Sequence, residues 1–192
     1  MLDHDPIGLF REWRQEALAS TDDPAAGAMI LATATPQGRP SARAVILRKV
    51  DERGFVFYTD SGSRKGAELA ANPYAALVFL WPQRQVRAEG EVMAVPGDEA
   101  DTDWLERPRD HQLATWACRQ SEPIAEPADI ERGMEEAARR FPEGAVPRPL
   151  YWGGYRLVPT VMEFWQARAN RLHDRVEYRQ EGWDWAVRRL AP

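Results

Sequence analysis

Ser63, Arg64 and Lys65 stand where a predicted strand gives way to a predicted helix, and this arrangement suits a phosphate group. The strand ends at Tyr58 and Thr59, and the helix begins after Ser63. A helix N-terminus offers free backbone N–H groups, to which these residues add a hydroxyl and two cations. Because the helix dipole favours anions there, Arg64 and Lys65 are locally unfavourable without an anionic ligand. A solvated pair of surface charges is the alternative interpretation.

A second candidate is Arg43, which lies inside the apolar segment SARAVILRK. Read as a β-strand, this segment places Arg43 on the same face as Val45 and Leu47. A charged group on a buried face needs a partner. The sequence leaves open a plainer possibility, in which Arg43 sits on an edge strand and extends its guanidinium to water.

The third candidate is the stretch NRLHDRVEY, residues 170–178. If it forms a strand, Arg171, His173 and Arg175 share one face, with neighbours roughly 6–7 Å apart. Two guanidiniums at that spacing repel each other unless an anionic or aromatic group lies between them. Trp165, in the preceding EFWQ, offers a flat aromatic face nearby. An ordinary solvent-exposed stripe of arginines is the alternative.

Other kinds of site find little support in the sequence. One cysteine and three scattered histidines do not supply the ligand spacing of a metal centre, so we predict no metal site. Neither a GxGxxG motif nor a Walker loop is present. Arginine is also common throughout, with 23 arginines against two lysines, which weakens any inference from one arginine alone.

Bulk composition indicates an ordinary soluble globular protein. The chain has 192 residues, 44% of them hydrophobic and 29% charged, and we expect a single domain over residues 1–192. A net charge of −5 argues against a nucleic-acid partner. No apolar run reaches membrane-spanning length and no leader opens the chain. The single Cys118 excludes an internal disulfide and is typical of the reducing cytoplasm.

The elements that must position these residues follow from periodicity and turn signals. We expect helices over 5–20 and 63–73 and a helical insert over about 97–141. We expect strands over 28–35, 41–50, 55–59, 74–81, 84–95, 151–159, 161–167, 171–179 and 185–192. Strands, a helical insert and then more strands predict an α+β fold, in which an antiparallel barrel carries helices on its outside.

In combination, these segments resemble the pyridoxamine 5′-phosphate oxidase family. The resemblance is carried, in chain order, by RAVILR, FVFYTDSGSRKGAELAANP, RQVRAEGEV, RPRDHQLATWACRQS, YWGGYRL, EFWQARANRLHDR and the final RLAP. It covers nearly the whole chain, and SRKG together with RLHDR is its most specific part. It implies an FMN-binding split β-barrel that forms a homodimer, with two flavins at the subunit interface.

The resemblance also implies residue roles. The FMN phosphate would be held by residues at the strand ends and the helix start, namely Arg43, Tyr58, Thr59, Ser63, Arg64, Lys65 and Gln85. Residues expected to reach the same flavin from the second subunit are Gln120, Ser121, Trp165 and Arg175. Arg171 and His173 would be the catalytic pair facing the substrate. In the family, the reduced substrate gives a hydride to the flavin, and dioxygen reoxidises the flavin with release of hydrogen peroxide.

The substrate residues depart from the family pattern. Family enzymes that make pyridoxal phosphate hold the substrate phosphate with a lysine, a tyrosine, an arginine and a serine. Only the arginine remains, as Arg107, and the other three positions hold Arg48, Asp103 and His111. Asp103 would oppose a phosphate, and on a helix it stands four residues before Arg107, where the two are expected to pair.

Three functions remain open. WLERP and CRQSE are similar to the phenazine-biosynthesis flavin oxidases, whereas WGGYR and RLHDR are similar to the vitamin B6 enzyme. We predict an FMN-dependent oxidase of a reduced nitrogen heteroaromatic such as a dihydrophenazine carboxylate, in preference to a pyridoxamine or pyridoxine 5′-phosphate oxidase. A non-catalytic flavin- or deazaflavin-binding protein is the third possibility, because split barrels also host such ligands.

Overall fold

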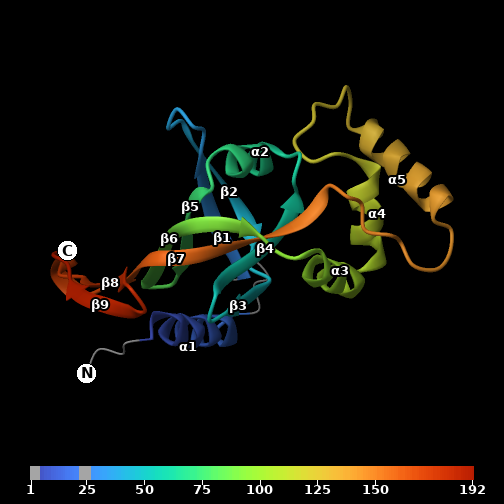
Figure 1. Cartoon of the computed structure of the whole chain (residues 1–192). Helices are drawn as coiled ribbons and strands as arrows, with labels where there is room; N and C mark the ends of the chain where they lie inside the picture. Colours follow the sequence, from blue (N-terminus) through green and yellow to red (C-terminus); the bar gives the residue numbers. More distant parts are fainter. Residues whose placement is uncertain (1–4, 22–26) are drawn as a thin grey trace.

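The computed structural model describes residues 5–21 and 27–192 (Figure 1). The prediction that no leader opens the chain concerns residues 1–4, which lie outside the described residues. The helices are α1 (Pro6–Ala19), α2 (Arg64–Ala71), α3 (Gly97–Glu106), α4 (Arg109–Ala117), α5 (Ala128–Arg140) and the short 3-10 helix η2 (Ala169–Arg171). The strands are β1 (Ala28–Ala34), β2 (Pro40–Ile46), β3 (Lys49–Asp51), β4 (Gly54–Asp60), β5 (Tyr74–Trp81), β6 (Arg84–Ala94), β7 (Trp152–Gln166), β8 (Asp174–Glu181) and β9 (Asp184–Arg189). Within the described ranges, no helix is long and apolar enough to cross a membrane.

Nine strands in the described part of the chain form one antiparallel sheet in the order β2-β1-β5-β6-β7-β4-β3, and β8 and β9 continue from β7. The first half of β7 pairs with β4 and its second half with β8. A register shift in β6 between Glu89 and Gly90 marks a β-bulge, a feature that bends a strand. The sheet curls into a half-barrel with helices around it, and the predicted antiparallel barrel is confirmed (Figure 1).

The main core fills the concave side of this sheet. Helix α1 closes one end of it with Phe10, whose ring centroid lies 4.9 Å from that of Phe55 and 4.6 Å from that of Phe79. All three side chains are essentially inaccessible to solvent. Burial of each is worth roughly 1.5–3 kcal/mol. This packed core therefore fixes the strands of the half-barrel, and with them the side chains on its edges.

The helical insert forms a second, smaller core. Trp104 of α3, Leu113 of α4, Ala137 of α5 and Val146 pack together, and the Trp104 indole Nε1 donates a hydrogen bond to the Val146 carbonyl oxygen at 2.7 Å. Figure 1 shows α3, α4 and α5 gathered at one end of the molecule and the β8–β9 hairpin at the other. This insert places α3 and α4 beside β4 and the first residues of β7.

Some of the strand expectations are wrong in part. Residues 41–50 form two strands, β2 and β3, and residues 151–159 and 161–167 lie in the single strand β7. Residues 169–171 form η2 rather than a strand, with positive φ angles of 57° at Asn170 and 60° at Arg171, and β8 starts only at Asp174. Strand alternation therefore does not apply across Arg171, His173 and Arg175. The expectation that these three share one face of a strand is not met, because the backbone turns before β8 begins.

Candidate functional site

The start of α2 builds a compact polar site around Lys65. Ser63 caps the helix, with its hydroxyl oxygen accepting from the backbone N–H of Gly66 at 3.4 Å. The Lys65 ammonium donates to the Thr59 hydroxyl at 3.1 Å, the Ser63 hydroxyl at 3.1 Å and Oε1 of Gln120 at 2.8 Å. Three parts of the chain thus place oxygen atoms around the Lys65 nitrogen: strand β4, the cap of α2 and the loop that carries Gln120.

Lys65 is a buried cation without a carboxylate partner. Its residue is only 6% exposed, and within the described residues no carboxylate oxygen lies within 4 Å of its ammonium. Burial, and secondarily the charge of Arg43, lower the pKa of Lys65. A buried charge that is paired only with neutral oxygens is costly. The arrangement therefore favours an anion bound next to Lys65.

Glu68 ties the two neighbouring arginines together. Its carboxylate accepts from Arg64 Nε at 2.9 Å and from Arg43 at 3.3 Å, and the hydroxyls of Ser41 and Thr33 also donate to it. Burial alone would raise the pKa of Glu68, but these hydrogen bonds outweigh it and lower the pKa to about 2. The carboxylate is therefore ionised at neutral pH and holds both guanidiniums in place.

Arg43 lies on the edge strand β2, as the plainer interpretation of its segment required. It shares the half-buried face of β2 with Ser41 and Val45. Its guanidinium is also held by the protein, because it donates to the Leu31 carbonyl at 3.2 Å and to the Thr33 hydroxyl at 2.7 Å as well as to Glu68.

A cavity of about 610 Å³ joins these groups to the other end of the site. It runs along the edge strand β2 from Lys65 past Tyr58 towards α3 and β7. Burial, followed by the charges of Asp103 and Glu99, raises the pKa of Tyr58 to about 12, so its hydroxyl stays protonated. The predicted site residues that line the cavity are Arg43, Arg48, Tyr58, Thr59, Arg64, Lys65, Arg107, Gln120 and Ser121.

Two placements correct the sequence-based assignment. Gln120 and Ser121 were expected to come from a second subunit, but they line the cavity of the same chain as Lys65. Ser121 does so with a φ of 73°, a strained conformation of the kind that functional sites retain. Gln85 was expected at the phosphate, but it does not line this cavity and lies opposite Trp165 on β7.

The far end of the cavity carries the altered residues. Arg48 Nε donates to Asp103 Oδ1 at 2.7 Å, so Asp103 pairs with Arg48 and not with Arg107, which was the expected partner. A contact across 55 residues has replaced the local one, because the fold brings Arg48, between β2 and β3, against Asp103 of α3. The Arg107 guanidinium instead stacks over the ring of Trp152 at 4.3 Å. His111 lines an adjacent cavity of about 390 Å³, which also contains Arg107.

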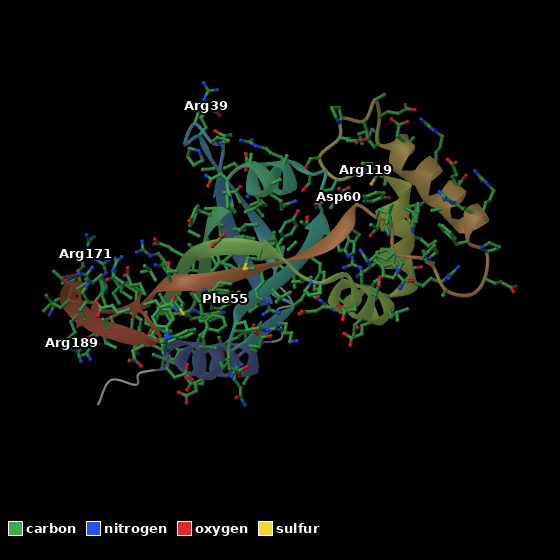
Figure 2. The ribbon with its side chains drawn as sticks, viewed as in Figure 1. Arg39, Phe55, Asp60, Arg119, Arg171 and Arg189 are labelled. Carbon is green, nitrogen blue, oxygen red and sulfur yellow. The ribbon has the colours of Figure 1, made fainter. Side chains whose placement is uncertain are left out.

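The remaining predicted residues lie on a different part of the molecule. Three of them, Gln85, Trp165 and Arg175, form a row of direct register partners that Leu80 continues, across β5, β6, β7 and β8. None of these four lines the cavity. Figure 2 shows Arg171 near the hairpin end, far from Asp60 and Arg119 beside the cavity. The predicted residues therefore fall into two groups, which a single chain does not bring together.

Hydrogen-bond and ring contacts within the second group, which contains Trp165, His173 and Arg175, stabilise its charged side chains. Arg175 donates twice to Glu163, at 2.7 and 3.1 Å, and this hydrogen-bonded carboxylate raises the pKa of Arg175. The ring of His173 lies 4.7 Å from that of Trp165. Its Nδ1 accepts from the backbone N–H of Arg168 at 3.2 Å. Glu163 also accepts from Arg87, so this one carboxylate offsets part of the charge of two arginines, a partner that the sequence-based interpretation did not anticipate.

Several participants were not found from the sequence. Glu68 carried a usable signal, since it stands four residues after Arg64 on one helix. Thr33, Ser41 and Trp152 carried none, because they come from other elements and only the fold brings them to the site. In the described part of the chain, no group of three or more His, Cys, Asp or Glu side chains could hold a metal ion.

Comparison with known proteins shows the family of this chain. Residues 19–139 match the family model described as pyridoxamine 5′-phosphate oxidase. A protein of Rubrobacter xylanophilus named pyridoxine/pyridoxamine 5′-phosphate oxidase is 52% identical over 99% of this chain and 88% of its own length. The chain belongs to the pyridoxamine 5′-phosphate oxidase family. Residues 152–192 match a second model, described as the pyridoxine 5′-phosphate oxidase C-terminal dimerisation region.

Three further proteins extend the comparison. A Rhodospirillum rubrum protein with the same name is 50% identical over 99% of this chain and 98% of its own. PhzG from Burkholderia lata, solved with tetrahydrophenazine-1-carboxylic acid, superposes with a TM-score of 0.93 at 33% identity, covering 99% of this chain and 94% of that one. An FMN-binding protein of Nostoc punctiforme related to this oxidase family shares the fold, with a TM-score of 0.76, 20% identity and full coverage of both chains.

Proposed function

We propose that this protein is an FMN-dependent oxidase whose cofactor phosphate binds at Lys65. The observation that carries the proposal is a charge balance. Arg43, Arg64 and Lys65 supply three positive charges, and Glu68 offsets one of them. A phosphate monoester carries about −1.5 to −2 charges near neutral pH, which matches the remainder. The Ser63 cap and the N-terminus of α2 add hydrogen-bond donors suited to the same group.

We further propose that the active protein is a homodimer with each flavin between two chains. One face of the sheet exposes large apolar side chains, with Ile30 42%, Ile46 53% and Leu80 74% exposed. Leu80 stands in the same row as Gln85 and Trp165, so that row belongs to this face. The cavity opens at β2, where Ile46 lines it. A second copy covering this face would bring its own row to the cavity of the first.

When bound, FMN supplies hydride acceptance and the return of electrons to dioxygen. The residues of the chain bind the cofactor and the substrate and orient them. Lys65 and the two arginines fix the phosphate, and the partner's row closes the site against water. Arg171 and His173, contributed with that row, are proposed to position the substrate and to stabilise charge that develops on it. Arg107 and Arg48 are proposed to hold its anionic group.

The first candidate substrate is a vitamin B6 5′-phosphate. The curated relatives that share about half of this sequence over nearly its whole length carry that activity in their names. The second candidate is a reduced phenazine carboxylate, the substrate class that the sequence alone favoured. The Arg48–Asp103 pair and the likeness to PhzG support it. Both candidates are nitrogen heterocycles with an anionic substituent. In the first the carbon to be oxidised is attached to an aromatic ring, and in the second the ring system itself is reduced.

Reconstitution followed by anaerobic reduction tests the proposal. The purified protein should take up one FMN per chain and become yellow. Mixing without oxygen should then bleach the flavin with pyridoxamine 5′-phosphate if the first candidate is right, and with a dihydrophenazine carboxylate if the second is. Uptake of FMN without bleaching by either would leave only a flavin-binding protein. Failure to take up FMN would overturn the whole proposal.

A further inference from the structure

Asp103 occupies a special place at the substrate end of the cavity. It lies on α3, is 8% exposed, and holds Arg48 through the 2.7 Å contact between Nε and Oδ1. Arg107 follows at the end of the same helix. Both arginines line the cavity, whereas Asp103 lies behind them and lines a neighbouring space of about 420 Å³ with Arg48. One buried carboxylate thus accompanies two cavity guanidiniums.

Polar atoms at this place lack partners. In the described part of the chain, Oδ2 of Asp103, Nε of Arg107 and Nε1 of Trp152 are buried without a hydrogen bond. Burial lowers the pKa of Arg107, the charge of Asp103 raises it and the charge of Arg48 lowers it. The two arginines therefore repel each other, and Asp103 relieves the repulsion. Buried polar atoms left unpaired are rare and call for a functional or structural reason.

The charge balance at this end differs from that at Lys65. Arg48 and Arg107 contribute two positive charges and Asp103 removes one, so the substrate end retains about one. Glu106 lowers this further, since its carboxylate lies 4.0 Å from Arg48, although it is exposed. The phosphate of FMN would thus face a net charge of about +2, and the anionic group of the substrate would face a net charge of about +1 or less.

We propose that Asp103 sets the charge preference of the substrate site, so that the site accepts a singly charged anion in preference to a phosphate dianion. The inference rests on the proposed function, because it takes the far end of the cavity as the substrate end. Asp103 acts through Arg48 and is a specificity-determining residue rather than a catalytic one. Without its charge, the guanidiniums of Arg48 and Arg107, which both line the cavity, would be left to a bound dianion, which would then bind more tightly.

Equilibrium binding to the FMN-loaded protein tests this without turnover. Three ligands that the flavin does not oxidise differ in the charge of their substituent. They are 4-deoxypyridoxine 5′-phosphate with a phosphate, phenazine-1-carboxylate with a carboxylate, and 4-deoxypyridoxine with neither. Asp103→Asn keeps the shape of the side chain and removes its charge. The variant should bind 4-deoxypyridoxine 5′-phosphate about tenfold more tightly than the wild-type protein does, which is the scale of one charged hydrogen bond. Its affinity for phenazine-1-carboxylate should rise less, and its affinity for 4-deoxypyridoxine should stay the same.

Two further variants serve as controls. Asp103→Glu retains the charge and should keep the wild-type ratio of phosphate to carboxylate affinity. Asp98→Asn removes an exposed charge from the same helix and should change no affinity. Because each ratio is measured on one preparation, partial loss of folded protein cancels.

An unchanged or weaker affinity of Asp103→Asn for the phosphate ligand would overturn the inference and reduce Asp103 to a brace for Arg48. Absence of binding by all three ligands to both proteins would overturn it as well. Failure of the proposed function is distinguishable, because it shows as absent FMN uptake or absent bleaching in the wild-type protein.

Discussion

Arg119 reaches across 59 residues to grip Asp60 with two hydrogen bonds, Nε to Oδ2 at 2.9 Å and a terminal nitrogen to Oδ1 at 3.2 Å (Figure 2). The guanidinium also stacks 3.8 Å above the ring of Tyr151. Asp60 accepts in addition from the backbone N–H groups of Gly62 and Gln120. This contact fastens the loop after α4 to the turn before α2, and so places the Gln120 side chain on Lys65.

Arg119→Met should therefore weaken FMN binding severalfold without touching the cofactor site directly. The variant keeps an apolar stem over Tyr151 but releases Asp60, so the Gln120 loop loses its anchor. Titration of the apoprotein with FMN, followed by flavin fluorescence, measures the change. Arg139→Met, on an exposed arginine of α5, is the matched control and should bind FMN normally. Equal affinities of the two variants would contradict a positioning role for Arg119.

Lys65→Met should separate cofactor affinity from stability. Loss of a charged hydrogen bond to phosphate should reduce FMN affinity about tenfold to a hundredfold. The FMN-free protein should be as stable as wild type or more so, because the variant removes a buried cation that no carboxylate partners in the described residues. Urea unfolding and FMN titration give the two values. Lys49→Met, at the chain's other lysine, is half-exposed and should change neither.

The pKa of Glu68 predicts a pH dependence of stability. Since it is lowered to about 2, from an ordinary value of 4.5, the ionised form stabilises the folded state. That contribution is fully present above about pH 4.5 and is lost as the pH falls towards 2. Glu68→Gln should cost about 2 kcal/mol of unfolding free energy near neutral pH. Urea unfolding of the FMN-free protein should show this difference shrinking near pH 3, and a constant difference would contradict the assignment.

Hybrid dimers test whether each site spans two chains. Lys65→Met damages the cavity of a chain, and Trp165→Ala damages the row that its partner should supply. In a dimer with one chain of each kind, one site combines both defects and the other combines an intact cavity with an intact row. The hybrid should thus bind half as much FMN as the wild-type dimer, whereas each variant homodimer binds poorly. Hybrids that fold but bind no better than their parents would rule out the shared site.

The sequence by itself determined the elements and the local part of the phosphate site. Apolar segments bounded by turn signals marked most of the strands, and the Asn-Pro that follows α2 marked its end. Ser63, Arg64 and Lys65 could be assigned to a helix N-terminus because a cap and its first turn are neighbours in the chain. The Arg64–Glu68 contact was equally within reach, since four residues make one helical turn.

Only the tertiary structure decided which charges meet. The sequence paired Asp103 with Arg107, its neighbour on α3, but the fold pairs it with Arg48. The fold likewise placed Gln120 beside Lys65 in the same chain, and it started strand β8 only after His173. The physical reason is that an ion pair forms where the backbone brings two groups within a few ångströms. At separations of 55 residues, no local periodicity encodes that distance.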